Sequence, residues 1–116
     1  MALEPSEQQW KITRSFARFA MEVPVSAMMS ESASIPVASG KMRDISLGGM
    51  AAFLDPPVAV GQRLWLEFLL PQATSPMRLL CKVRHDYGER FGFQFLNISP
   101  EQQEQIRQSC VGLVNV

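Results

Sequence analysis

Apolar residues alternate with polar ones along several short stretches of this chain, and turns rich in proline or glycine separate the stretches. In the clearest three, residues 63–70, 77–86 and 91–95, the alternating positions are mostly leucine, valine or phenylalanine. A period of two is typical of strands that bury one face. Because short turns connect the stretches and no long helical pattern lies between them, the sequence favours an antiparallel sheet over a βαβ fold.

Six such stretches predict a small closed sheet. They cover residues 19–26, 41–46, 50–54, 63–70, 77–86 and 91–95. Segment 30–40, rich in serine, alanine and proline, is interpreted as a loop, and 87–89 as a tight hairpin turn. If Ile45 faces the core, alternation points Arg43 the same way. We therefore expect an all-β fold, a six-stranded antiparallel barrel of the split-barrel type.

The end of the chain carries the signals of a helix. Ser99 suits the N-cap, Pro100 the first helical position, and Gln102 completes a capping box. Apolar residues then follow at spacings of four and three, ending at Leu113, and form one narrow stripe. We expect a C-terminal helix over about 100–114 that covers an open end of the barrel. The predicted organisation is a flexible arm over 1–13 and one domain over 14–116.

Composition excludes several classes of protein. The chain has 116 residues, enough for one modest core, and its 11 basic and 11 acidic side chains cancel, which argues against a general nucleic-acid binder. Two cysteines without metal spacing indicate a reducing compartment. The acidic, polar start is unlike a signal peptide, and no apolar run is long enough to span a bilayer. We expect a soluble, cytoplasmic protein without membrane insertion.

Catalytic groups are scarce in this sequence. His85 is the only histidine and has no evident partner, so a rim position on the surface is its simplest interpretation. Cys81 falls at an inward strand position and Cys110 on the helix stripe, where free cysteines usually pack in a core. No zinc, P-loop or nucleophile-elbow motif occurs. The sequence predicts neither an enzyme, nor a metal site, nor a cofactor.

Two segments together could hold an anionic nucleotide. Residues 44–49 read Asp-Ile-Ser-Leu-Gly-Gly, and alternation places Asp44 and Ser46 on one face. Gly49 leaves the backbone open to a close ligand. Upstream, Arg14 and Arg18 supply two guanidiniums, which suit phosphates and guanine edges. Each segment alone also has a structural explanation. The arginine pair could be a solvated basic turn, and residues 44–49 could be a strand end followed by a tight turn.

The order of these segments resembles the PilZ domain family. The family pattern is RxxxR, here Arg14 to Arg18, followed by D/N-x-S-x-x-G, here Asp44 to Gly49. Segment 91–95, Phe-Gly-Phe-Gln-Phe, also looks like the family's last strand. The resemblance covers roughly residues 10–114 and implies a six-stranded barrel with a C-terminal helix.

The resemblance implies a bacterial receptor for the second messenger cyclic di-GMP, with roles in motility or biofilm signalling. It assigns Arg14, Arg18, Asp44, Ser46 and Gly49 to the ligand. In the family the arm folds over the ligand, which implies a signal passed to an unidentified effector protein or through self-association. Many members carry another basic residue where this chain has Thr13, so one nucleotide and a stacked pair remain alternatives.

Three other functions remain as alternatives. The first is a PilZ-fold adaptor of the pilus or motility machinery that does not bind nucleotide. The second is a single-stranded nucleic-acid binder on an OB-like barrel, which requires exposed aromatics interleaved with basic residues. The third is a small flavin-dependent barrel enzyme, for which the sequence offers no specific motif.

Overall fold

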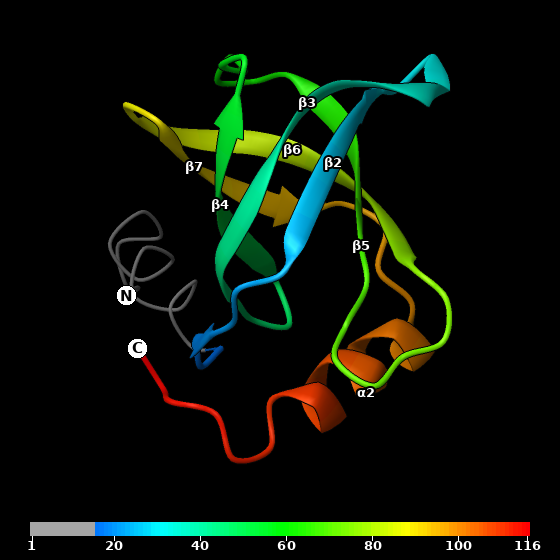
Figure 1. The fold of residues 1–116 in the computed structure, drawn as a ribbon, viewed down its shortest axis with the longest axis vertical. Coiled ribbons are helices and arrows are strands. Elements are labelled where there is room, and N and C mark those ends of the chain that lie inside the picture. The colour runs from blue at the N-terminus through cyan, green and yellow to red at the C-terminus, as the bar shows by residue number, and fades with distance from the viewer. Residues whose placement is uncertain (1–15) are drawn as a thin grey trace, which may run out of the picture.

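The computed structural model describes residues 16–116, apart from the side chains of residues 32–34. The predicted arm over 1–13, and Arg14, lie outside the described residues. Within them the chain forms seven strands and one helix (Figure 1). Their bounds are β1 Phe19–Ala20, β2 Pro24–Met29, β3 Ser32–Ile45, β4 Gly49–Asp55, β5 Arg63–Phe68, β6 Met77–Tyr87, β7 Arg90–Phe95 and α2 Pro100–Ser109.

Six of the strands close into an antiparallel barrel. The order along the sheet is β1-β3-β2-β5-β6-β7-β4, and β3 also pairs with β4, which joins the two ends. Closure leaves β1 as a short additional strand on β3, so the barrel is made by β2 to β7, as predicted. The fourteen residues of β3 allow it to pair with three neighbours along its length.

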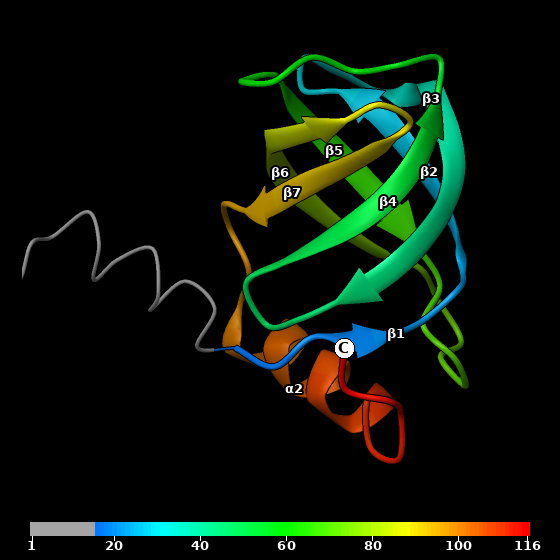
Figure 2. The same cartoon turned by 90° about the vertical axis from the view of Figure 1, so that its left-hand side faces the viewer.

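The barrel interior holds the core, because alternating residues of each strand point inward. Phe91, Leu64, Leu66, Leu79 and Val83 are almost completely buried there. Removing this apolar surface from water is the main force that closes the sheet. At one end, Ile106 of α2 completes the core. Figure 2 shows α2 beneath this end of the barrel, with β1 between the barrel and the last residues of the chain.

Most of segment 30–40 is a strand and not the predicted loop; residues 30–31 form the turn that precedes it. From Ser32 the chain pairs with β2, with Ser39 opposite Ser26 and Ala38 opposite Ala27. Pro36, which cannot donate to a ladder, lies where the register between β2 and β3 shifts. The small residues and proline therefore belong to an irregular hairpin. The predicted strand 19–26 is likewise interrupted, and residues 21–23 separate β1 from β2.

Helix α2 begins as predicted and ends earlier. The hydroxyl of Ser99 accepts a hydrogen bond from the Gln102 amide, and the Gln102 side chain accepts one from the Ser99 amide, at 3.1 and 3.0 Å. The helix ends at Ser109, not near residue 114, and a turn follows in which Gly112 has a φ of 84°. Such a left-handed conformation suits glycine and turns the chain back toward β1.

Candidate functional site

The pairing of β1 with β3 brings the two predicted binding segments together. Ala20 lies opposite Asp44, and Phe19 lies opposite Ile45. Arg18 directly precedes Phe19, so it lies beside the start of the turn that contains Ser46. Its side chain is half-buried and forms no ion pair with residues 16–116. One of the two predicted arginines is therefore next to the predicted Asp-x-Ser segment, while Arg14 lies outside the described residues.

Asp44 is buried and paired with its neighbour. Its side chain is 3% exposed, and its carboxylate accepts a hydrogen bond of 2.9 Å from the guanidinium of Arg43. The ladder between β3 and β4 shifts between Met42 and Asp44, so Arg43 is the extra residue of a bulge. The predicted orientation of Arg43 is thus wrong: Ile45 faces the core, and the Arg43 side chain is 47% exposed.

Ser46 organises the turn between β3 and β4. Its hydroxyl oxygen accepts hydrogen bonds from the amides of Gly48 and Gly49, at 3.1 and 3.2 Å, and donates one to the Gly49 carbonyl. The Ser46 amide also donates to that carbonyl, at 2.8 Å. These local hydrogen bonds agree with the structural explanation of residues 44–49, a strand end followed by a tight turn. They fix the position of the hydroxyl next to β1.

Gly49 is required by strand pairing. A Cβ at this position would collide with the backbone carbonyl of Phe93 in β7, since Gly49 lies opposite Gln94 in the ladder. The neighbouring Gly48 instead faces the ring of Phe16, which would lie 3.0 Å from a Cβ there. Gly49 therefore allows β4 to pack closely against β7, and a contact with a ligand would be a second role of this glycine.

The last residues of the chain pair with β1 on the side away from β3. The Val116 amide donates to the Arg18 carbonyl at 2.7 Å, and the Ala20 amide donates to the Val114 carbonyl at 3.0 Å. Asn115 lies opposite Phe19 in the same arrangement. The segment that carries Arg18 is thus held between β3 and the C-terminal residues. No sequence pattern predicts this contact.

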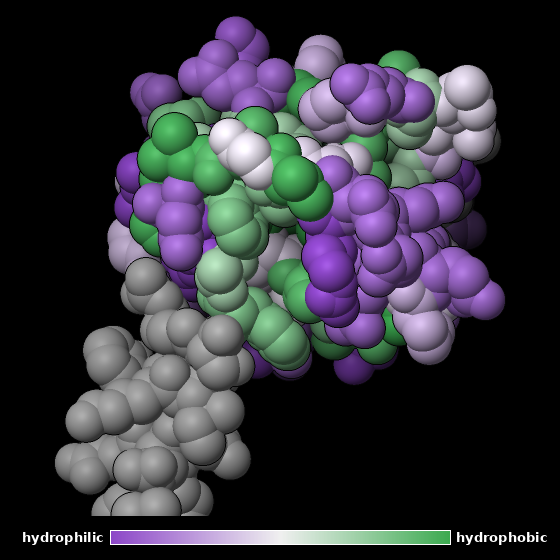
Figure 3. Space-filling view, turned by 90° about the horizontal axis from the view of Figure 1, so that it is seen from below, coloured by the Kyte–Doolittle hydropathy of each residue, from purple (hydrophilic) through white to green (hydrophobic). Residues whose placement is uncertain are grey.

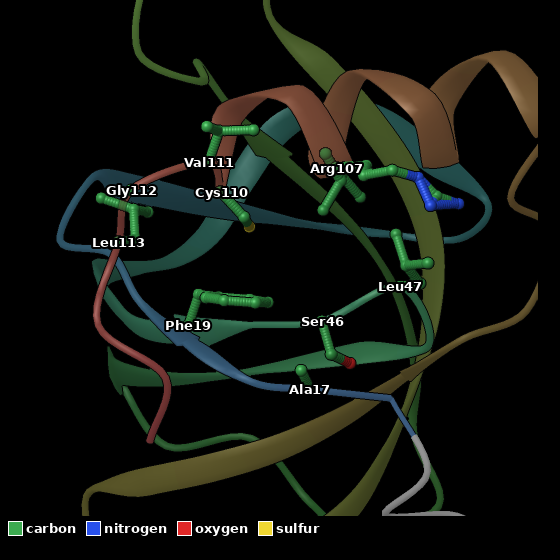
Figure 4. A pocket seen from close by; sticks show the side chains of 10 residues that line it. Ala17, Phe19, Ser46, Leu47, Arg107, Cys110, Val111, Gly112 and Leu113 are labelled. Carbon is green, nitrogen blue, oxygen red and sulfur yellow. The ribbon is translucent and has the colours of Figure 1, made fainter.

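A pocket of about 440 Å³ lies between β1, the β3–β4 turn and the end of α2. Its walls are mostly apolar, and the exposed Val111 and the half-exposed Leu113 belong to it. Figure 3 shows apolar side chains gathered around this recess at the lower end of the molecule. In Figure 4 the Phe19 ring lies across the pocket from the Cys110 side chain, while the guanidinium of Arg107 points away. Pockets of this volume are large enough for a small ligand.

The remaining candidates for chemistry are not assembled into a site. His85 is exposed, whereas Cys81 and Cys110 are buried, and burial raises the pKa of both thiols. Among residues 16–116, no group of three or more His, Cys, Asp or Glu side chains is arranged to hold a metal ion. Within the same residues no helix is long and apolar enough to cross a membrane.

Comparison with known proteins identifies the fold. The model of the family described as "PilZ domain" matches residues 12–112. The PilZ domain of YcgR from Escherichia coli, solved with c-di-GMP, has a TM-score of 0.68 and 20% identity, covering 86% of this chain and 90% of that one. The PilZ domain of CeSA from a cellulose-synthesising bacterium has a TM-score of 0.61 and 18% identity, covering 82% and 95%.

A third structure, the inhibitor of motility MotI/DgrA from Bacillus subtilis, has a TM-score of 0.66 and 22% identity, covering 84% of this chain and 49% of that one. No curated protein sequence gives a significant match. The family model spans most of the chain, and the closed barrel followed by a helix matches the solved PilZ domains. This chain belongs to the PilZ domain family.

Proposed function

We propose that this chain is a receptor for cyclic di-GMP that binds through Arg14, Arg18, Asp44, Ser46 and Gly49. The observation that carries the proposal is the β1–β3 register, in which Ala20 pairs with Asp44 and the neighbouring Arg18 adjoins the Ser46 turn. Arg18 and Ser46, which are more than twenty-five positions apart in the chain, thereby meet at one end of the barrel. The likeness to a YcgR domain solved with c-di-GMP supports the same ligand.

Each residue type suits a part of this ligand. Cyclic di-GMP presents two phosphates and two guanines, and a guanidinium can bind either a phosphate or the O6 and N7 edge of a guanine through paired hydrogen bonds. A carboxylate at Asp44 can accept from the guanine N1 and N2 donors, which adenine does not offer in that arrangement. The hydroxyl of Ser46 can donate to a base or a phosphate oxygen.

Arg43 is a further charged group at the proposed site, and neither sequence motif includes it. Its guanidinium donates a hydrogen bond of 2.9 Å to the Asp44 carboxylate, so a bound guanine must either share this carboxylate with Arg43 or displace Arg43 from it. Its side chain is half-exposed and can rotate toward solvent or toward a bound phosphate. The only signal in the sequence was its position directly before Asp44.

The output of binding would pass through β1. Ordering of the arm on the ligand changes the strand that holds Arg18, and that strand is bonded to the C-terminal residues. The receiver is an unidentified effector protein or a second copy, and Leu69, which is 47% exposed, is a candidate contact. In this proposal the chain is non-catalytic, needs no cofactor and works in the cytoplasm.

Isothermal titration with cyclic di-GMP tests the proposal, with GMP and cyclic di-AMP as controls. We expect selective, saturable binding that weakens as salt rises, because the contacts are partly ionic. Arg18→Ala should abolish binding, whereas Arg63→Ala, which removes an exposed arginine of β5, should not. Absence of heat with the unmodified protein would assign the chain to the adaptor class. Equal effects of the two variants would refute the site.

A further inference from the structure

A row of alternating cations and aromatic rings crosses four strands on the outside of the barrel. Lys41 of β3 lies opposite Phe53 of β4, Phe53 lies opposite Arg90 of β7, and Arg90 lies opposite Tyr87 of β6. The side chains lie on the outer surface, since Lys41, Phe53 and Tyr87 are exposed and Arg90 is half-buried. The pair of Lys41 and Phe53 lies two positions along β4 from Ala51, which is opposite Asp44, so the row borders the proposed Arg18 and Asp44 site.

The aromatic part of this row is held in place. The guanidinium carbon of Arg90 lies 4.9 Å from the centre of the Tyr87 ring, and the His85 ring stacks on that ring with the centres 5.7 Å apart. The carbonyl of Glu89, at the hairpin turn, accepts a hydrogen bond of 3.3 Å from the Leu54 amide. Because the side chains are positioned in advance, binding here would cost little conformational entropy.

A shallow cleft of about 370 Å³ opens in this row, lined by Phe53, Tyr87, Glu89 and Arg90. Phe53 is 44% exposed and Tyr87 is 60% exposed. Tyrosine, phenylalanine and arginine are enriched in the centres of protein interfaces, where they supply most of the binding energy. The cleft therefore has the composition of a protein contact.

Charges of both signs border the two aromatic rings. We define the hairpin patch as Lys41, Phe53, Asp55, Tyr87, Glu89 and Arg90. Asp55 is two residues beyond Phe53 on the same face of β4, and both are exposed. None of the four charged residues of the patch forms an ion pair with any residue in 16–116. The patch thus offers two unpaired cations and two unpaired acids.

We propose that the hairpin patch is the interface through which two copies of this chain associate. In a two-fold contact the same surface meets itself, so each cation can meet an acid of the other copy. Glu89 would face Arg90 of the second copy and the aromatic rings would pack between them. The two acids disfavour a nucleic acid as the occupant, and the four charges disfavour a lipid surface. The patch has six residues, well below the roughly 20–30 residues a side of a stable interface, which predicts a weak, reversible dimer.

Sedimentation velocity from micromolar to millimolar protein, without nucleotide, tests the proposal. We expect the unmodified chain to dimerise as concentration rises. Arg90→Glu and Glu89→Arg should each weaken dimerisation about tenfold or more, because like charges then meet across the contact. The double variant Glu89→Arg/Arg90→Glu exchanges the charges and should recover dimerisation. Arg63→Glu and Glu31→Arg, which make the same charge changes elsewhere, should have no such effect.

A mixing experiment makes the test independent of folding. The Arg90→Glu and Glu89→Arg proteins, each weakened in self-association, should dimerise more strongly when mixed in equal amounts than either does alone, and a misfolded variant could not do so. The proposal is overturned if the unmodified chain stays monomeric at millimolar concentration, if the two control variants weaken the dimer equally, or if the mixture dimerises no more strongly than either variant alone. Because no nucleotide is present, these outcomes are separate from those of the cyclic di-GMP titration.

Discussion

The guanidinium of Arg43 donates a hydrogen bond of 2.9 Å to the carboxylate of Asp44, its neighbour in the chain. Adjacent residues of a regular strand point to opposite faces, and the bulge at Arg43 is what allows the contact. The carboxylate is 3% exposed, so it has lost most of its hydration, and Arg43 compensates for part of that loss. The pair therefore stabilises the strand end that the proposed ligand site requires.

Loss of Arg43 should destabilise the folded protein. Arg43→Ala leaves a buried carboxylate without its cation, and we expect the free energy of unfolding to fall by about 1–3 kcal/mol. Asp44→Asn in the same chain should recover part of the loss, because a neutral amide is less costly to bury. Urea unfolding measures both, with Arg63→Ala as the control. A loss no larger than that of the control would show that solvent already satisfies Asp44.

Asp44 should set the preference for guanine. In titrations, Asp44→Ala should weaken cyclic di-GMP binding and reduce the preference for cyclic di-GMP over cyclic di-AMP, because the acceptor for the guanine N1 and N2 donors is lost. Unfolding curves of the same variant separate this effect from a loss of fold. A variant that is folded and still prefers guanine as strongly as before would assign Asp44 to a structural role only.

The two glycines of the turn should differ in their tolerance of a side chain. Gly49→Ala places a methyl group against the Phe93 carbonyl, so β4 and β7 must separate locally, and we expect a loss of about 2–4 kcal/mol in unfolding free energy. Gly48→Ala meets the partly exposed Phe16 ring, which can move, and should cost less than about 1 kcal/mol. Thermal or urea unfolding compares them. Equal losses would contradict the packing role of Gly49.

The C-terminal residues should hold β1 in place. Val116→Pro removes the amide that donates to the Arg18 carbonyl, whereas Val116→Ala keeps it. We expect the Ala20 amide, which is bonded to Val114, to exchange hydrogen faster in the proline variant and at the normal rate in the alanine variant. Unchanged exchange in both would mean that pairing with β3 alone fixes β1.

Stability should fall at alkaline pH because of the buried thiols. Burial raises the pKa of Cys81 above its ordinary value of 9.0 and raises that of Cys110 in the same direction. Above that value the unfolded chain releases protons that the folded chain retains, so unfolding becomes easier by up to about 1.4 kcal/mol per pH unit for each thiol. Below it, neither thiol makes stability depend on pH.

The measurement is urea unfolding between about pH 8 and about pH 10. Cys81→Ala should reduce the slope of unfolding free energy against pH, although it lowers stability at every pH by leaving a small cavity. Cys110→Ala should reduce the slope as well. Parallel curves for Cys81→Ala and the unmodified chain would show that this thiol is not what drives the alkaline loss.

Much of the barrel could be predicted from periodicity. Strands with strict alternation, such as the one that carries Phe91, Phe93 and Phe95, bury one face and so follow a period of two. The start of α2 followed from side-chain capping, which is a local interaction. The strand that begins at Ser32 could not be predicted, because its small residues and proline resemble a loop, and only pairing with β2 makes it a strand.

Local sequence patterns are sufficient to predict which residues alternate into a barrel, where the helix begins and that the chain resembles PilZ domains. Those features depend on local patterns of neighbouring residues. Tertiary structure decided the bulge that turns Arg43 onto Asp44, the pairing of Val116 with Arg18, and the row of Lys41, Phe53, Arg90 and Tyr87. Each of these depends on strand register, which is set by closure of the whole sheet and by packing of its core.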